Sequence, residues 1–200
     1  LKDAATDAAN ELLQEIKTLQ RKNIHNYIAY ALDYFWCGYY QEAISFLQIG
    51  IDETASAAGT YPMALYFIGW FNMKLGNDAA GKAHFAMAAG ANPAGCFPNQ
   101  PDAMLALQAA IAYHPGDAKA HYYLGNFLYA HKQYQDAIAS WERAVALDDS
   151  FPTPHRNLAL AYYNKSLLPD KALQSLEKAF QADTTDARVL MELDQLCKKL

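Results

Sequence analysis

Residues 121–144 read HYYLGNFLYAHKQYQDAIASWERA, and the same pattern returns at residues 155–179 as HRNLALAYYNKSLLPDKALQSLEKA. The two copies begin 34 residues apart, at His121 and His155. In the first part of each copy large residues recur at i, i+3 and i+7, which is one face of an α-helix. The second part places small and large residues at i, i+4 and i+7, which predicts a helix packed against the first. Each copy is expected to form a helix pair, and neighbouring pairs must stack to bury their apolar faces.

The same template fits two stretches nearer the N-terminus. In one, the first helix is marked by Tyr27 and the second by Ala43. In the other, Leu65 and Gly81 hold these positions, and Gly76 falls at the turn between the helices. The link between these two copies, residues 53–61, is longer than the template and is expected to be a surface loop.

The pattern is incomplete between residues 93 and 115. Residues 103–110 fit a second helix, but residues 94–101 (AGCFPNQP) hold two prolines and a glycine, which disfavour a helix. This segment is a candidate bend or contact site, and plain loss of one helix is the alternative. Residues 4–21 fit a second helix without its first, and residues 186–200 fit a first helix without its second. We predict one solenoid cut from a longer array, with units at 1–23, 24–57, 62–95, 96–117 (degenerate), 118–151, 152–186 and 187–200.

This period and spacing resemble the tetratricopeptide repeat (TPR) family. The resemblance covers residues 4–199 and implies an all-α, right-handed helical solenoid with one degenerate repeat. Residues 96–197, with YYLGN at 122–126, PHRNLA at 154–159 and ELDQL at 192–196, further resemble the repeat array of bacterial TPR proteins that follows an N-terminal domain of unknown function. In that family the N-terminal domain looks like a carbohydrate-associated β-sandwich. The narrower resemblance implies that the parent protein has further domains.

Composition excludes several classes of function. The net charge is −5 and no run of Lys or Arg occurs, so binding to nucleic acid is not expected. The longest apolar run, residues 61–73, is too short to cross a membrane. The three cysteines, Cys37, Cys96 and Cys197, are odd in number and far apart. They favour a reducing compartment, and hence a cytoplasmic location, or they are simply small buried residues.

The sequence offers little for catalysis. His121 and His155 occupy the same repeat position, so a metal or acid–base pair is conceivable, but packing is the favoured interpretation because this position holds a large packing residue. No CxxC or HExxH spacing occurs, and no carboxylate pair is placed as in a glycosidase. We therefore expect no metal, no cofactor and no enzymatic activity. The aspartates fall at helix starts and turns, where they cap N–H groups: Asp102, Asp117, Asp136, Asp148, Asp149, Asp170 and Asp186.

In the TPR family the first helices line a concave groove. Its N-terminal half is expected to be apolar, and these residues either bind a partner or pack on one another: His25, Ile28, Leu32, Phe35, Met63, Tyr66, Trp70 and Met73. The inner face of the C-terminal half is expected to include Thr153, Leu160, Met191 and Gln195. Its polar and aromatic side chains are expected to have no partners within the chain. The predicted protein- or peptide-binding site consists of Lys119, Tyr122, Asn126, Tyr129, Arg156, Asn157, Tyr163 and Arg188.

Part of this set resembles the carboxylate clamp by which some family members hold the C-terminal acid of a peptide. Asn126, Asn157 and Arg188 match the clamp, whereas Tyr122 replaces a lysine and Glu192 replaces an arginine. The predicted function is a non-catalytic protein- or peptide-binding scaffold, with acidic ligand groups attracted by Lys119, Arg156 and Arg188. Two alternatives stay open: a structural spacer or self-association module, and an accessory repeat domain of a carbohydrate-active protein.

Overall fold

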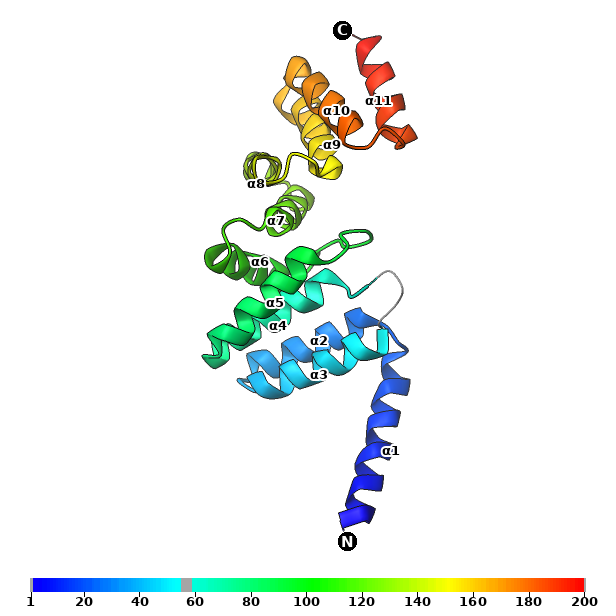
Figure 1. The fold of residues 1–200 in the computed structure, drawn as a ribbon, viewed down its shortest axis with the longest axis vertical. Helices are drawn as coiled ribbons and strands as arrows, with labels where there is room; N and C mark the ends of the chain where they lie inside the picture. The colour runs from blue at the N-terminus through cyan, green and yellow to red at the C-terminus, as the bar shows by residue number, and fades with distance from the viewer. Residues whose placement is uncertain (1, 55–58, 200) are drawn as a thin grey trace. The chain divides into compact units, whose positions relative to one another are not determined.

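The computed structural model describes residues 2–54 and 59–199, and every regular element in these ranges is a helix (Figure 1). The predicted all-α class is confirmed. The chain divides into two compact units, Leu1–Cys96 and Phe97–Leu200. We call them the N-terminal unit and the C-terminal unit. The boundary lies inside the segment 94–101, which the sequence marked as irregular.

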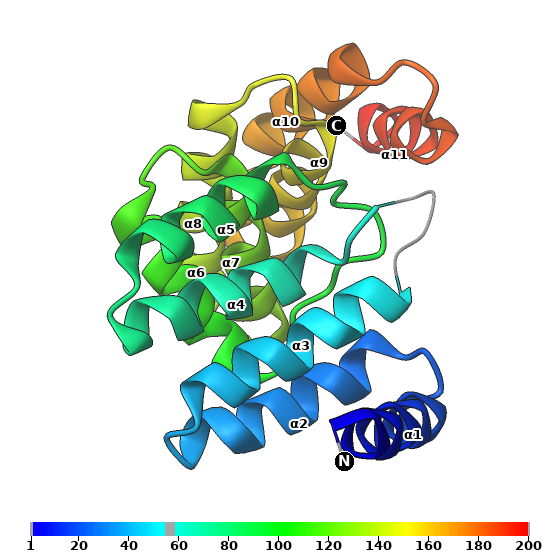
Figure 2. The same cartoon turned by 60° about the horizontal axis from the view of Figure 1, so that its bottom comes forward.

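The described residues of the N-terminal unit form five helices: α1 (Lys2–Gln20), α2 (Ile24–Trp36), α3 (Tyr40–Thr54), α4 (Pro62–Leu75) and α5 (Asp78–Gly90). Helices α2 and α3 lie side by side, as do α4 and α5, and α3 packs on α4 (Figure 2). The predicted surface loop at residues 53–61 begins later than expected, because α3 continues through Thr54. Residues 55–58 of that loop lie outside the described residues.

Aromatic side chains fill the core of the N-terminal unit. The ring of Phe35 lies 4.3 Å from that of Trp70 and stacks on Phe71 at 4.6 Å. The sequence left open whether the apolar half of the predicted groove binds a partner or packs on itself. Six of its eight residues are buried within the chain, so packing accounts for most of them. The buried members are Ile28, Leu32, Phe35, Met63, Tyr66 and Trp70.

The C-terminal unit begins with α6 and continues in helix pairs. Its elements are α6 (Pro101–Tyr113), α7 (Ala118–Ala130), α8 (Tyr134–Leu147), α9 (Pro152–Ala161), the π-helical turn η1 (Tyr162–Ser166), α10 (Pro169–Ala182) and α11 (Ala187–Cys197). Helix α7 pairs with α8 and α9 with α10, while α6, α8 and α10 pack on the next helix in the chain. Residues 91–100, which precede α6, form no helix.

Glycine and aromatic residues meet where the two helices of a pair cross. A Cβ atom on Gly125 would lie 2.4 Å from Nε1 of Trp141, and one on Gly69 would lie 2.5 Å from the ring of Phe85. Only a residue without a side chain lets these backbones approach a large ring. The corresponding positions in the other two full repeats hold Ala and Leu instead: Ala31 with Leu47, and Ala159 with Leu176.

The π turn accommodates one extra residue. The first helices of the last two full repeats begin 34 residues apart, at Ala118 and Pro152, but their second helices begin 35 apart, at Tyr134 and Pro169. The added residue widens the end of the first helix into η1, which closes on Leu167 in a left-handed conformation with φ 54°. π-helical geometry occurs in proteins mostly as single turns of this kind within α-helices.

Aspartate and asparagine side chains shape several turns. Of the aspartates that the sequence analysis expected to cap N–H groups, Asp117, Asp148 and Asp186 accept such hydrogen bonds. Asp148 and Asp183 each accept a hydrogen bond from the backbone N–H two residues later, at 3.1 and 2.9 Å. Asn92 does the same for Ala94 at 2.9 Å. Asp117 caps the N-terminus of α7 by accepting from Ala120 N–H at 2.9 Å. These bonds satisfy N–H groups that have no partner within a helix.

Candidate functional site

All eight residues of the predicted site lie in the C-terminal unit, on α7, α9, η1 and α11. The first helices of successive repeats carry them, so they follow one another along that unit. The structure brings most of them into contact with other side chains of the same chain. The expectation that they have no partners within the chain is therefore wrong.

The two asparagines belong to one hydrogen-bonded group with a tryptophan. Trp141 Nε1 donates to Asn126 Oδ1 at 3.1 Å and to the carbonyl oxygen of Tyr122 at 3.2 Å. Asn157 Nδ2 donates to the same Oδ1 of Asn126 at 3.0 Å. Because an indole N–H can only donate, this contact fixes the orientation of the Asn126 amide. The group links α7, α8 and α9.

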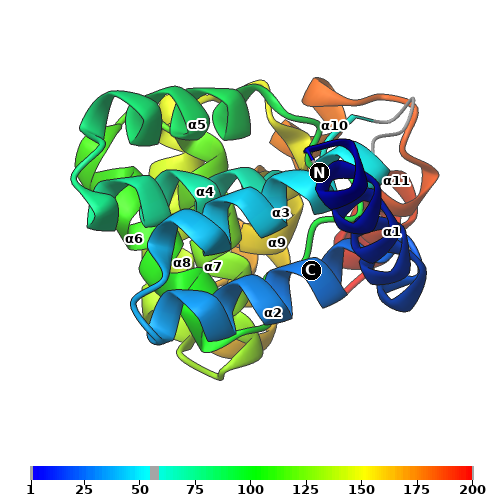
Figure 3. The ribbon, with the colours of Figure 1, turned by 90° about the horizontal axis from the view of Figure 1, so that it is seen from below.

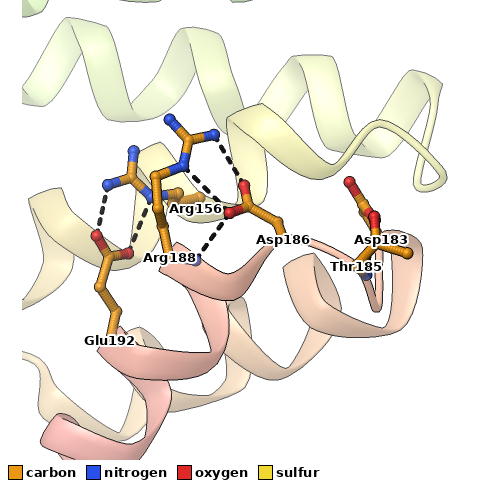
Figure 4. A network of polar contacts seen from close by, with 6 residues as sticks. All are labelled: Arg156, Asp183, Thr185, Asp186, Arg188 and Glu192. Carbon is orange, nitrogen blue, oxygen red and sulfur yellow. Dashed lines mark hydrogen bonds and ion pairs between the residues drawn. The ribbon is translucent and has the colours of Figure 1, made fainter.

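The two arginines are each paired with a carboxylate: Arg156 with Glu192, in the middle of α11, and Arg188 with Asp186, the N-cap of that helix (Figure 4). Arg156 binds Glu192 through two hydrogen bonds, Nε to Oε2 at 2.9 Å and a terminal nitrogen to Oε1 at 2.5 Å. This forked geometry is the strongest that a guanidinium and a carboxylate can adopt. Glu192, which replaces a clamp arginine, thus neutralises a neighbouring cation.

Arg188 binds Asp186, the N-cap residue of its own helix, at 2.9 and 3.1 Å. The bond from the Arg188 side chain, with its backbone N–H, lowers the pKa of Asp186 to about 2. The carboxylate is therefore charged at neutral pH. The guanidinium of Arg188 remains 74% exposed, so solvent still reaches it.

The remaining predicted residues are mostly aromatic. Tyr122 is buried, with its ring 4.9 Å from that of Phe151. Tyr129 packs on Tyr134 at 5.0 Å and on Trp141 at 5.3 Å. Lys119, at the start of α7, is half-buried. Tyr122 and Tyr129 therefore take part in packing between helices as well as belonging to the predicted binding site.

Tyr163 lies in a pocket between α9, α10 and α11. The pocket has a volume of about 200 Å³, and Lys199 Nζ lies over the Tyr163 ring at 5.6 Å from its centroid. Carbon atoms make up most of its lining, and Glu192 connects it to the Arg156 ion pair. The lining residues are Ala159, Leu160, Tyr163, Asn164, Leu176, Glu192, Gln195, Leu196 and Lys199.

Sequence reasoning placed Leu160 and Gln195 on the inner face but left Leu176, Leu196 and Lys199 out. Leu176 matches the template as a packing residue, so spacing alone does not show that it also lines a pocket. Leu196 and Lys199 match no position of the template. The 35-residue spacing of the second helices is a sequence signal for this pocket, because the extra residue falls next to Tyr163.

The two histidines at the same repeat position pack differently. His155 is buried, with Nε2 3.1 Å from the carbonyl oxygen of Asp149. His121 is half-buried, and burial together with Arg143 lowers its pKa. Among the described residues no group of three or more His, Cys, Asp or Glu side chains could hold a metal ion. No helix in those ranges is long and apolar enough to span a bilayer.

Comparison with known families agrees with this helix-pair architecture. A tetratricopeptide repeat model matches residues 106–139, and a TPR repeat model matches residues 125–166. Residues 106–166 thus match tetratricopeptide repeats, and the fold is the all-α arrangement of helix pairs that the residue spacing predicted.

Several solved structures are similar over most of the chain. MamA is 21% identical, with 94% of each chain covered and a TM-score of 0.44. YrrB, described as a TPR protein with an unusual peptide-binding site, is 20% identical over 94% of this chain and 98% of its own, with a TM-score of 0.43. TTC0263, a thermophilic TPR protein of Thermus thermophilus, is 21% identical over 87% of this chain and 98% of its own, with a TM-score of 0.44. Identities and TM-scores at this level say nothing about the ligand of this chain.

Proposed function

We propose that this chain is a non-catalytic scaffold that binds a protein or peptide on the first helices of its C-terminal unit. The observation that carries the proposal is the apolar pocket at Tyr163. Leu160, Tyr163 and Gln195, which the repeat pattern assigns to the inner face, line it together with Leu196. A pocket of about 200 Å³ accommodates one large apolar side chain, the kind of anchor that dominates peptide interfaces.

The asparagine pair on α7 and α9 suits a peptide backbone. Because Asn126 directs its Oδ1 at Trp141 and Asn157, its Nδ2 is left to donate to a ligand carbonyl group. Asn157 uses its Nδ2 inside the chain, so its Oδ1 is left to accept from a ligand N–H. Donor and acceptor side by side match the two polar groups of a peptide bond.

Acidic ligand groups play a smaller part in this proposal than the sequence suggested. Arg156 and Arg188 already face Glu192 and Asp186, so an acidic ligand must displace a carboxylate from a charge-assisted hydrogen bond. The anchor side chain and the backbone contacts then provide the affinity, and acidic groups adjust it. Glu192→Gln is expected to raise affinity for peptides with an acidic group beside the anchor.

Selection from a phage-displayed random peptide library on the immobilised protein tests the proposal. The strongest peptide is synthesised, and its affinity is measured by isothermal titration calorimetry. We expect Tyr163→Ala and Asn126→Ala each to weaken binding at least about tenfold, which is about 1.4 kcal/mol. Tyr39→Ala is the matched control, because Tyr39 is an exposed tyrosine of the N-terminal unit. If Tyr39→Ala reduces affinity and the other two variants do not, the site is wrongly placed.

Self-association is a second candidate, supported by α11. Leu190 and Met191 are 51% and 56% exposed on this helix, an apolar surface that suits a second copy of the chain. Light scattering across a concentration series separates the two functions. A dimer that Leu190→Glu dissociates supports self-association, and a monomer at every concentration excludes it.

A further inference from the structure

One helix face in the N-terminal unit is exposed although the same face is covered in other repeats. Tyr30 and Tyr34 of α2 are 53% and 41% exposed. The residues at these two positions in the later repeats are buried or half-buried. They are Ile68 and Asn72 in α4, Leu124 and Leu128 in α7, and Leu158 and Tyr162 in α9 and η1.

In the covered cases, the second helix of the preceding repeat packs on this face. Helix α3 packs on α4, and α8 packs on α9. The Tyr162 hydroxyl donates to Glu142 Oε1 of α8 at 2.5 Å, which shows the contact at one of the two positions. Helix α1 occupies the corresponding place in the sequence before α2, but it extends away from the α2–α3 pair (Figures 1 and 3).

The link between α1 and α2 is one residue shorter than the three links of this kind in the C-terminal unit. Residues 114–117, 148–151 and 183–186 each form a four-residue link between a second helix and the next first helix, whereas only residues 21–23 join α1 to α2. Arg21 and Lys22 both adopt left-handed conformations, with φ 54° and 50°. Residues with a side chain are strained there.

The α1–α2 link is one residue shorter because Gln20 belongs to α1 rather than to the link. In the repeat alignment Gln20 corresponds to Asp148 and Asp183, which open their four-residue links, but here it is the last residue of α1. Its side chain is 6% exposed, and its buried Oε1 has no hydrogen-bond partner. An unsatisfied buried acceptor of this kind destabilises the position in which it is found.

We propose that α1 has a second position, in which Gln20 leaves the helix and α1 packs along α2 over Tyr30 and Tyr34. The link then has four residues, like the other three, and the strain at Arg21 and Lys22 is released. The salt bridge between Lys17 and Glu53 must open, but such partly exposed pairs contribute little. Helix α1 is thus a lid that covers or uncovers the aromatic face of α2.

Cross-linking between α1 and α2 tests this movement. Gln14 of α1 corresponds to Glu142 of α8, and Tyr34 corresponds to Tyr162, so Gln14 lies beside Tyr34 only in the second position. Gln14→Cys and Tyr34→Cys are combined with Cys37→Ser and Cys197→Ser, which remove the exposed native thiols. A short-spacer bismaleimide is added, and intact mass distinguishes one bridging reagent from two separate adducts. The pair Glu142→Cys and Tyr162→Cys, in the same background, is the positive control.

Arg21→Pro shifts the equilibrium towards the second position. Proline cannot adopt φ 54°, and it disfavours a helical conformation of the preceding residue, here Gln20. It also copies the His114–Pro115 sequence of a regular link. We expect an intramolecular bridge in the double-cysteine protein and at least about a fivefold faster reaction with Arg21→Pro. The paired substitutions Gln20→Asp and Lys22→Ser, which copy Asp148 and Ser150, should act in the same direction.

Two results would overturn the proposal. One is the absence of an intramolecular bridge in all three proteins while the control pair reacts. The other is a bridge that forms only between two chains, which would make a second copy the occupant of the α2 face. Cys96 is buried, so its modification marks unfolded molecules, which are left out of the yield.

Discussion

The contact between Gly125 and Trp141 shows how single residues set the distance between two helices. Where the second helix carries a large ring, the first helix carries glycine, and where it carries leucine, the first helix carries alanine. The choice follows from volume, because a Cβ at Gly125 would overlap the indole ring. The residue types at the two positions are therefore coupled within each pair.

Gly125→Ala is expected to destabilise the protein, although alanine is the better helix former by about 1 kcal/mol. Overpacking against Trp141 costs about 1–3 kcal/mol, so we expect a net loss of about 1 kcal/mol in the free energy of unfolding. Urea denaturation measures it. Gly90→Ala is the control, because nothing lies within 4 Å of the added Cβ.

In a Trp141→Leu background, which copies the Ala159 and Leu176 pair, Gly125→Ala should cost less than it does alone. Trp141→Leu itself destabilises through lost volume and lost hydrogen bonds to Asn126 and Tyr122. The double-mutant cycle is expected to show at least about 1 kcal/mol of coupling. Strictly additive effects would mean that the overlap relaxes at no cost.

Residue spacing did not predict the partners of the side chains that it assigned to the inner face. Arg156 and Glu192 have opposite charges on the first helices of adjacent repeats, and that signal was available. A comparison with the clamp marks Glu192 only as a departure, whereas the opposite charges predict the ion pair that the structure shows. The bond from Trp141 to Asn126 could not be predicted, because it depends on the rotamer of a residue whose spacing indicates only packing.

At the scale of the element, η1 absorbs an inserted residue within a helix rather than in a loop. The widened turn contains Tyr163 and Asn164, which both line the pocket. It also ends on Leu167, which is 79% exposed. The sequence showed the longer spacing, but not that the extra residue enters the helix, because a longer loop fits the same count.

Deletion of Asn164 should convert η1 into regular α-helix and restore a 34-residue repeat. The fold should survive, because Asn164 is exposed and its Nδ2 bonds only to the Leu160 carbonyl one turn earlier. We expect an unchanged circular dichroism spectrum and a Tm within a few degrees of the parent. Binding of the selected peptide should fall at least about tenfold, since the pocket wall moves. Unchanged affinity would separate the π turn from the site.

At the scale of the whole molecule, contacts are concentrated within two units that meet at residues 96 and 97. The sequence marked this place through the prolines and glycine of residues 94–101, although it predicted one continuous array of repeats. The assignment of residues 1–23, 96–117 and 187–200 to incomplete repeats stays a prediction. In repeat proteins, stability is a sum of local terms and contacts between neighbours.

The two units are expected to respond separately to a local substitution. Trp36 and Trp70 report on the N-terminal unit and Trp141 on the C-terminal unit, so Trp→Phe variants isolate each fluorescence signal. A substitution that destabilises the C-terminal unit, such as Ala144→Gly in α8, should lower the urea midpoint reported by Trp141 more than that reported by Trp70. Equal shifts of both midpoints would show a single cooperative transition.

The matched volumes at Gly125–Trp141 and Ala159–Leu176 have a consequence for recombining this chain with relatives. A crossover inside a helix pair would join a first helix carrying alanine to a second helix carrying tryptophan, and the hybrid would inherit a steric overlap. A crossover in the short links at residues 148–151 or 183–186 exchanges both members together. The helix pair is therefore the segment that can be exchanged as a whole. Hybrids with crossovers between pairs should express and fold more often than hybrids with crossovers within them.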